Sequence, residues 1–185
     1  VYGYTMNQKE TINALLKAFD EKKSATIDPV YEREGYARYE DGSDLKDTYV
    51  EVDISRQHLW YYKNGELIIS TNIVTGDVSH KGFTNKGVGS ILSKETKKDL
   101  IGKNFDGSDY KVPVKYWMPI GWDGEGLHDA GWRSAFGANY YMYSGSNGCI
   151  NMPPDQVGKL FNLVEYNTPV VVYESSTDYS PPMLY

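Results

Sequence analysis

The chain has 185 residues, which is enough for one medium-sized domain or for one domain and part of another. Hydrophobic residues make up 40% of the sequence, so it can build a core, and no apolar run approaches the ~20 residues of a membrane span. The formal net charge of −6 argues against a nucleic-acid partner, because nucleic-acid surfaces need clustered Lys and Arg.

A helix is the first predicted element and covers residues 7–19. Asn7 can cap this helix, and Glu10 follows three residues later as in a capping box. The apolar residues recur at helical spacing and form one stripe: Ile12, Leu15, Leu16 and Phe19. One helix cannot bury such a stripe alone. We therefore expect residues 1–46 to be the end of an upstream domain followed by a connector.

From Thr48 onward the composition favours strands. Strands are predicted at residues 49–54, 58–62, 66–74, 88–92, 111–118, 126–128 and 170–173. Asn64-Gly65 is a strong hairpin signal between two of them. The basic cluster at residues 94–98 is expected to be a solvated surface turn, and residues 155–164 a short helix. The predicted fold class is therefore mainly β, with one short helix near the C-terminal end.

Cys149 is the only cysteine in the chain and lies in the sequence Ser146-Asn147-Gly148-Cys149-Ile150-Asn151. A lone cysteine forms neither an internal disulfide nor a multi-thiolate metal site. Free cysteines are often buried and inert, and Ile150 and Met152 would suit a packed strand. However, Ser-Asn-Gly before the thiol and Pro153-Pro154 after it are loop signals. We therefore interpret Cys149 as a nucleophile.

His128 is the candidate base for this thiol. A cysteine needs a neighbouring base or positive charge to become a thiolate near pH 7. His58, at a strand start, and His80, in a polar loop, are expected to be structural or solvated. Either the side chain of Asp129 or a backbone carbonyl could hold the imidazole in the useful tautomer, and the sequence leaves both open.

The residues around the cysteine suggest how an oxyanion would be stabilised. Gly148 permits unusual dihedrals, so the backbone amides of Asn147, Gly148 and Cys149 could point together into a nest. Ser146 could donate a hydrogen bond to the site, and Asn151 could fix the loop. The alternative for Ser146 is that it only terminates a turn, and the alternative for Asn151 is that it is an ordinary surface asparagine.

These residues resemble the L,D-transpeptidases of peptidoglycan synthesis, the YkuD-type catalytic domain. In that family a histidine precedes Ser-His/Arg-Gly-Cys-Ile/Val-Arg/Asn, and here His128 precedes Cys149 by about twenty positions. The resemblance covers residues 47–175, which leaves 176–185 as a C-terminal tail. Residues 1–46 resemble the end of the peptidoglycan-binding-like domain that precedes the catalytic domain. Asn147 stands where many members carry a second histidine or an arginine.

The resemblance implies a β-sandwich-like fold and a specific reaction. Cys149 would attack the carbonyl that joins the third residue of a donor stem peptide to its terminal D-alanine. His128 would protonate the leaving D-alanine, and an acceptor amine would take the thioester to give a 3→3 cross-link. Carbapenems would acylate the same sulfur. No cofactor, metal or nucleic acid is implied. The location would be extracytoplasmic, at the bacterial cell wall or the outer face of the cytoplasmic membrane, with a membrane anchor expected upstream.

In this family the cysteine lies in a cleft under a mobile lid. We expect residues 110–126 to form part of that lid or of the cleft wall. The expected substrate-binding side chains are those of Trp117, Met118, Trp122, Trp132, Ser146 and Asn151. For the ring-bearing and thioether residues the alternative is a place in the core.

Two other hypotheses use the same cysteine differently. Sortases also join wall peptides with Cys and His, but they need an arginine soon after the cysteine, and no arginine follows Cys149. A wall-glycan binding module with an inert cysteine is the alternative from outside enzymology. A covalent carbapenem adduct on Cys149 would separate the transpeptidase from this module.

Overall fold

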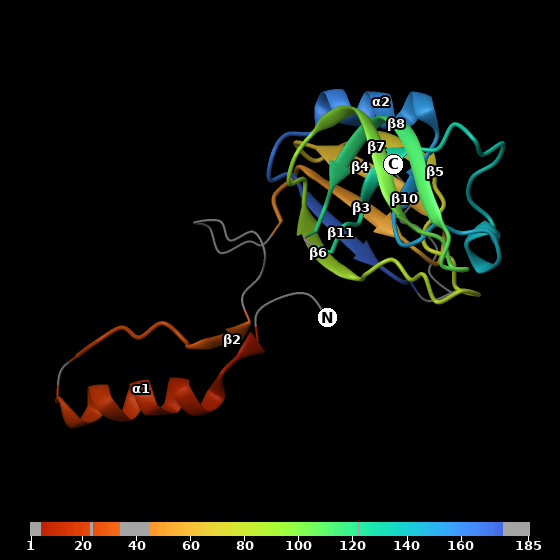
Figure 1. Cartoon of the computed structure of the whole chain (residues 1–185). Coiled ribbons are helices and arrows are strands. Elements are labelled where there is room, and N and C mark those ends of the chain that lie inside the picture. The colour runs from red at the N-terminus through yellow and green to blue at the C-terminus, as the bar shows by residue number, and fades with distance from the viewer. Residues whose placement is uncertain (1–4, 23, 34–44, 122, 176–185) are drawn as a thin grey trace. The chain divides into compact units, whose positions relative to one another are not determined.

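The computed structural model describes residues 5–22, 24–33, 45–121 and 123–175 (Figure 1). The chain divides by its internal contacts into two units, Val1–Asp44 and Leu45–Tyr185. The units are described separately below. None of the described helices combines the length and the apolar character needed to cross a bilayer.

The first unit contains the predicted helix. Helix α1 (Gln8–Asp20) follows strand β1 (Thr5–Met6), which pairs antiparallel with β2 (Tyr31–Arg33). The Asn7 side chain accepts a hydrogen bond from the Glu10 amide at 3.0 Å, which confirms the predicted cap. The apolar stripe of α1 is exposed, and Phe19 at its end is 86% exposed. The assignment of residues 1–46 to an upstream domain stays a prediction.

The second unit contains two β-sheets. The five-stranded sheet has the order β5–β4–β3–β11–β6, with bounds Glu66–Asn72, His58–Lys63, Tyr49–Asp53, Pro169–Tyr173 and Gly87–Ser90. The four-stranded sheet has the order β10–β9–β8–β7, with bounds Ile150–Met152, Gly126–Asp129, Asp109–Pro119 and Glu95–Lys103. The mainly β class predicted from the sequence is confirmed.

The turn between β4 and β5 forms as its sequence predicts. Lys63 pairs with Glu66, so the loop has only two residues, Asn64 and Gly65. Both have positive φ, at 52° and 80°, which is the type I′ geometry that Asn-Gly favours. The register shifts between Tyr62 and Tyr61, and beyond this irregularity Tyr61 and Leu59 lie in the core.

The core lies between the two sheets and is closed by helix α2 (Pro154–Leu163). Both sheets contribute fully buried residues, such as Val50 and Leu59 from one and Leu127 and Ile150 from the other. Helix α2 packs against β9, β8 and β5 and buries Val157 and Leu160 (Figure 1). Each such side chain contributes about 1.5–3 kcal/mol by leaving water. This packing fixes β9 and β10, the strands that carry the candidate site.

The basic cluster at residues 94–98 is not a turn, so that prediction was wrong. Glu95 begins the long strand β7, which pairs antiparallel with β8. Its charged side chains form exposed ion pairs: Lys98 with Glu95 at 2.8 Å, and Lys111 of β8 with Asp99 at 2.9 Å. Charge density correctly indicated exposure, but an exposed strand carries charges as readily as a turn does.

The short strands β1 and β2 of the first unit were not predicted, and neither were two short elements of the second unit. Strand β10 has three residues, and the 3₁₀ helix η1 covers Tyr140–Met142. Neither is long enough to show a periodicity. The short helix predicted at 155–164 is α2, and it begins one residue earlier, at Pro154.

Candidate active site

Strands β9 and β10 bring the histidine and the cysteine together. They pair in parallel, and Asn151 of β10 lies opposite His128 of β9. Cys149 directly precedes β10. Side chains alternate along a strand, so Cys149 and Asn151 face the side on which His128 lies. A short parallel pair thus joins residues that are far apart in the chain.

Cys149 and His128 line one pocket of about 220 Å³. The β7–β8 hairpin forms one wall of this pocket, through Leu100, Asn104, Tyr110 and Val112. The segment between β9 and β10 forms the rest, through Trp132, Arg133, Gly145, Ser146 and Asn147. The thiol is therefore open to a pocket and not sealed in the core.

The Cys149 thiol is partly buried and neutral at pH 7. Its Sγ lies 3.9 Å from the carbonyl oxygen of Gly124. Burial raises the pKa of this thiol to about 11, a hydrogen bond from the Gly126 amide opposes the rise, and the charges of Glu125 and Asp123 add to it. A thiol of this kind needs a base at the moment of attack.

The His128 ring is 3% exposed and has a defined tautomer. Its Nδ1 lies 2.9 Å from the backbone oxygen of Asp129, so Nδ1 carries the proton and Nε2 is left as the basic nitrogen. Burial lowers the pKa of this imidazole, and the Asp129 hydrogen bond and charge oppose that shift. The ring is therefore neutral at pH 7, which suits a general base.

The carboxylate of Asp129 faces away from the imidazole. One of its oxygens accepts hydrogen bonds from the backbone amides of Lys115 and Tyr116, each at 2.8 Å. The carboxylate therefore fixes β8 against the end of β9. Of the two arrangements that the sequence left open, the backbone carbonyl is the one in contact with the ring.

Asn151 lies between His128 and Arg133 and is 2% exposed. In the amide orientation that satisfies both neighbours, its oxygen accepts from Arg133 Nε at 2.8 Å and from Nη2 at 3.2 Å. Its nitrogen then donates to His128 Nε2 at 3.1 Å. Asn151 is thus a buried bridge between the imidazole and the guanidinium, and not a surface asparagine.

The loop before Cys149 is held by a dense set of hydrogen bonds. Gly148 has φ +121°, and a Cβ there would lie 3.0 Å from a Glu125 carboxylate oxygen. The Gly148 amide donates to Ser146 Oγ at 3.1 Å, and that hydroxyl donates to the Cys149 carbonyl. Thr84 Oγ1 donates to the Gly148 carbonyl at 2.7 Å. The Gly148 amide is therefore already engaged.

The amides on either side of Gly148 differ from it. Within the described residues, the backbone amides of Asn147 and Cys149 donate to no protein acceptor. The Asn147 side chain instead donates to the Lys103 carbonyl at 3.1 Å, which ties the loop to the end of β7. Of the three backbone amides predicted to form an oxyanion nest, those of Asn147 and Cys149 can therefore donate a hydrogen bond to a ligand.

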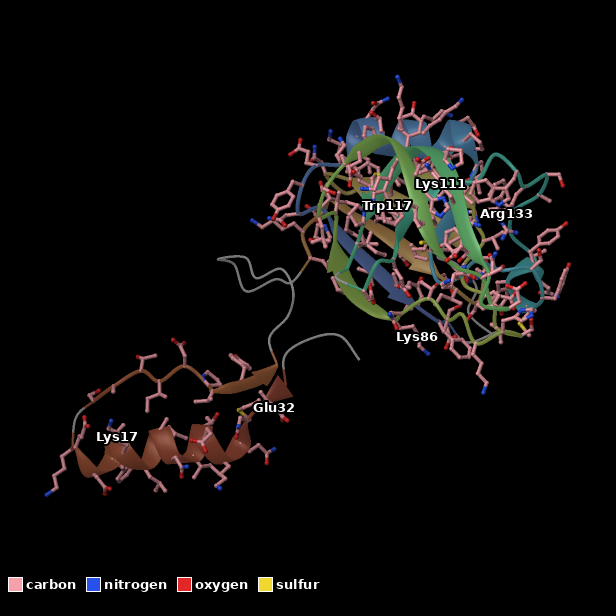
Figure 2. All side chains as sticks on the ribbon, in the orientation of Figure 1. Lys17, Glu32, Lys86, Lys111, Trp117 and Arg133 are labelled. Carbon is pink, nitrogen blue, oxygen red and sulfur yellow. The ribbon has the colours of Figure 1, made fainter. Side chains whose placement is uncertain are left out.

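The predicted aromatic and apolar lining is only partly found in the pocket. Trp132 lines it and is 54% exposed. Trp117 is buried, with its ring centroid 5.9 Å from that of His128, so it packs beside the imidazole (Figure 2 labels it). Met118 is fully buried in the core, so its predicted place in the lining was wrong. Trp122 lies outside the described residues.

Of the two roles predicted for residues 110–126, lid or cleft wall, the described residues 110–121 and 123–126 supply part of the wall. Most of this stretch belongs to β8, which is paired on both sides. Tyr110 and Val112 line the pocket as part of its wall, and at the other end of the stretch the Gly124 carbonyl contacts the Cys149 thiol. Adjacent residues of a strand face opposite sides, and this is why Met118 entered the core while Trp117 lies beside the imidazole.

The sequence did not single out three residues that contact the site. Arg133 follows His128 closely, but its contact with Asn151 depends on how the loop folds back. Glu125 and Thr84 contact Gly148 from segments whose sequences carry no signal for that contact. In the described part of the chain, no cluster of His, Cys, Asp or Glu is suited to a metal ion.

A model of the L,D-transpeptidase catalytic domain, YkuD, matches residues 47–172. The chain belongs to this family. The match covers both sheets except Tyr173, the last residue of β11, and it includes every site residue described above. No curated protein is significantly similar to the chain.

Solved structures of this family are similar to the chain. A cysteine-to-serine mutant of Enterococcus faecium L,D-transpeptidase is 37% identical, with a TM-score of 0.70, over 93% of this chain and 66% of that one. The catalytic domain of E. faecium L,D-transpeptidase acylated by ertapenem is 45% identical, with a TM-score of 0.63, over 70% of this chain and 98% of that one. The chain thus spans 66% of the longer relative.

Proposed function

We propose that this protein is a peptidoglycan L,D-transpeptidase in which Cys149 carries the acyl group. The observation that supports this most is that Cys149 and a neutral, oriented His128 line one pocket of a YkuD domain. The donor is a stem tetrapeptide, D-alanine is released, and the product is a 3→3 cross-link. The site is expected to work outside the cytoplasm, at the bacterial cell wall.

The proposed reaction begins with transfer of the thiol proton to His128 Nε2. In the ligand-free pocket that nitrogen faces Asn151, and the thiol faces the Gly124 carbonyl. Rotation about the Cα–Cβ bond of Cys149 turns the sulfur toward the ring. Catalytic hydrogen bonds are often long before substrate binds and tighten in the complex.

The thiolate then attacks the carbonyl carbon of the third stem residue. The tetrahedral oxyanion accepts hydrogen bonds from the amides of Asn147 and Cys149. The C–N bond to D-alanine breaks, and the nitrogen takes the proton that His128 holds. An acceptor amine next loses a proton to His128 and attacks the thioester. The amide cross-link forms, and the Cys149 thiol is restored with the proton from His128.

The carbonyl of Asp129 acts as the positioning group for His128 in this scheme. It keeps the proton on Nδ1 and so leaves Nε2 unprotonated. The hydrogen bond that Nε2 accepts from Asn151 must break before this nitrogen takes the thiol proton. The Asp129 carboxylate supports the site indirectly, through the amides of β8. Trp132 and Ser146 border the space that the donor peptide occupies.

β-Lactams are proposed to acylate the same sulfur. A relative that is 45% identical has been solved acylated by ertapenem, which is a β-lactam. A strained lactam carbonyl offers the thiolate the same electrophile as the donor peptide. We therefore expect carbapenems to block cross-linking by this protein.

The formation of cross-linked dimers from purified disaccharide tetrapeptide tests the proposal. We expect Cys149→Ala to abolish dimers, and His128→Ala to slow their formation by about 10²–10⁴, the usual contribution of a positioned proton-transfer group. His58→Gln is the matched control, since His58 bonds to Asn72 and Ser70 on the other sheet. Dimers from Cys149→Ala at the wild-type rate would overturn the proposal.

A further inference from the structure

Arg133 presents an uncompensated positive charge to the pocket. The Arg133 side chain, which is labelled in Figure 2, is half-buried and lines the same pocket as Cys149 and His128. Its hydrogen bonds, through Nε and Nη2, go to the oxygen of the Asn151 amide. That partner is neutral, so it orients the guanidinium without balancing its charge.

No described carboxylate neutralises Arg133. The ion pairs among the described residues leave Arg133 out, and none of the residues lining the pocket is acidic. The acid whose charge affects it is Asp77. The oxygens of Asp77 are already occupied by Ser79, His80 and the Gly145 amide. Burial lowers the pKa of Arg133, and the charge of Asp77 opposes that shift without overcoming it.

A half-buried guanidinium of this kind is suited to an anionic ligand. Arginine binds carboxylates through paired N–H groups, and the interaction is stronger where water is partly excluded. Asn151 uses Nε and Nη2, so the remaining N–H groups are available to a ligand in the pocket. The question is which carboxylate of a donor peptide reaches them.

The position of Arg133 relative to His128 answers this question. One amide group, that of Asn151, separates the guanidinium from Nε2. In the proposed reaction, Nε2 protonates the nitrogen of the leaving amino acid. The α-carboxylate of that amino acid is two bonds from this nitrogen. A leaving group placed for protonation therefore keeps its carboxylate near Nε2, and among the residues lining this pocket Arg133 is the one that always carries a positive charge.

We propose that Arg133 binds the terminal carboxylate of the leaving D-amino acid, and so selects donors in which this residue is the last of the stem. This rests on the proposed transpeptidase function and adds a specificity determinant to it. Longer stems place their carboxylate at least one residue further away. Donors that end in an amide lack the charge altogether.

Acylation of Cys149 by two matched donors tests the proposal. One tetrapeptide ends in D-alanine with a free carboxylate, and the other ends in D-alaninamide. We expect the full chain to react with the acid about 10- to 100-fold faster, the effect of one charge-assisted hydrogen-bonded pair. In Arg133→Gln the acid should fall to the rate of the amide, and in Arg133→Lys it should fall less.

Two controls separate charge recognition from structural damage. Lys111→Gln removes the same charge from the β7–β8 hairpin, where Lys111 pairs with Asp99 outside the pocket (labelled in Figure 2), and it should keep the preference for the acid. The rate of Cys149 alkylation by iodoacetamide and the thermal midpoint report whether Arg133→Gln leaves the thiol and the fold intact. An equal loss on both donors would mean that Arg133 only positions Asn151, and would overturn the proposal.

The remaining outcomes are also distinguishable. Similar wild-type acylation rates with the acid and the amide donor would overturn the proposal that Arg133 binds the terminal carboxylate, and they would not contradict the proposed transpeptidase function. No thioester from either donor would remove both. A second donor pair, with the glutamyl carboxylate of the stem free or amidated, identifies the source of the charge. An Arg133-dependent preference within that pair alone would overturn the assignment to the leaving residue.

Discussion

At the residue scale, the site pairs a neutral thiol with a neutral imidazole. Burial raises the pKa of Cys149 and lowers that of His128, so an ion pair does not exist in the ligand-free pocket. Reactivity must therefore arise when substrate excludes water and aligns the two groups. The resting thiol is protected from oxidants and alkylating agents, because only the thiolate reacts quickly.

Glu125 adds a pH-dependent charge next to this thiol. It borders Gly148, and its carboxylate accepts hydrogen bonds from the Asn85 amide at 3.2 and 3.1 Å. Burial raises its pKa to about 7, the Asn85 hydrogen bonds oppose the rise, and the charge of Asp123 adds to it. Below pH 6 Glu125 is neutral, and above pH 8 it is negative and opposes thiolate formation.

We therefore predict that Glu125→Gln makes Cys149 more reactive only at the higher pH. The alkylation rate with iodoacetamide should rise about 2- to 10-fold at pH 8–9 and stay unchanged below pH 6. Asp123→Asn is the control and should have a smaller effect, because Asp123 is exposed and its charge acts on the thiol less than that of Glu125. Equal rates for wild type and Glu125→Gln across the whole range would contradict this electrostatic role.

At the scale of elements, the site depends on loops that are fastened to each other. Asp77 is 2% exposed, and its Oδ2 accepts from the Gly145 amide at 2.8 Å, close to the segment that leads to Cys149. Its Oδ1 accepts from Ser79 Oγ at 2.6 Å and from the His80 amide at 3.1 Å. Burial raises the pKa of Asp77, but these hydrogen bonds outweigh it and lower the pKa to about 2.

Asp77→Asn should destabilise the protein by about 1–3 kcal/mol, because the new amide nitrogen faces the Gly145 donor. The folded-state pKa lies below the ordinary 3.8, so the wild-type advantage is present above pH 4 and is lost as pH falls toward 2. Urea unfolding at pH 7 and pH 3 measures this. Asp106→Asn, in an exposed turn where it caps Ser108, is the control and should change little.

The elements also show what the sequence could predict. The Asn64-Gly65 hairpin and the Asn7 cap depend on residues a few positions apart, and both were predicted correctly. Strand β10 was missed because three residues carry no periodicity. Strand β7 was taken for a turn because its charges were read without their cross-strand partners on β8.

The same distinction applies to the candidate site. Cys149 and His128 could be predicted from residue type and spacing, because few side chains can act as a nucleophile or as a general base. Met118 was misplaced because the direction in which a side chain points depends on register, which pairing with β9 fixes. The bridge from His128 through Asn151 to Arg133 forms because the segment after β9 folds back, so that β10, which carries Asn151, pairs with β9, which carries His128. No pattern among neighbouring residues in the sequence predicts this pairing.

At the scale of the whole molecule, the proposed chemistry lies in one unit. Every residue of the proposed mechanism falls within residues 47–172, which the family model matches. The preceding unit carries a helix with an exposed apolar stripe, and its relation to an upstream wall-binding domain stays a prediction. Although the chain has a net charge of −6, it places Arg133, which no described carboxylate pairs with, in the same pocket as its proposed nucleophile, and this suits the proposed binding of an anionic peptide end.

Peptide mapping after reaction with the tetrapeptide donor, without acceptor and quenched in acid, tests the role of Cys149 most directly. We expect the peptide that contains Cys149 to gain the mass of the donor less D-alanine, with one equivalent of free D-alanine released. An acyl group on any other residue, or D-alanine released by Cys149→Ala as fast as by the wild type, would contradict that role.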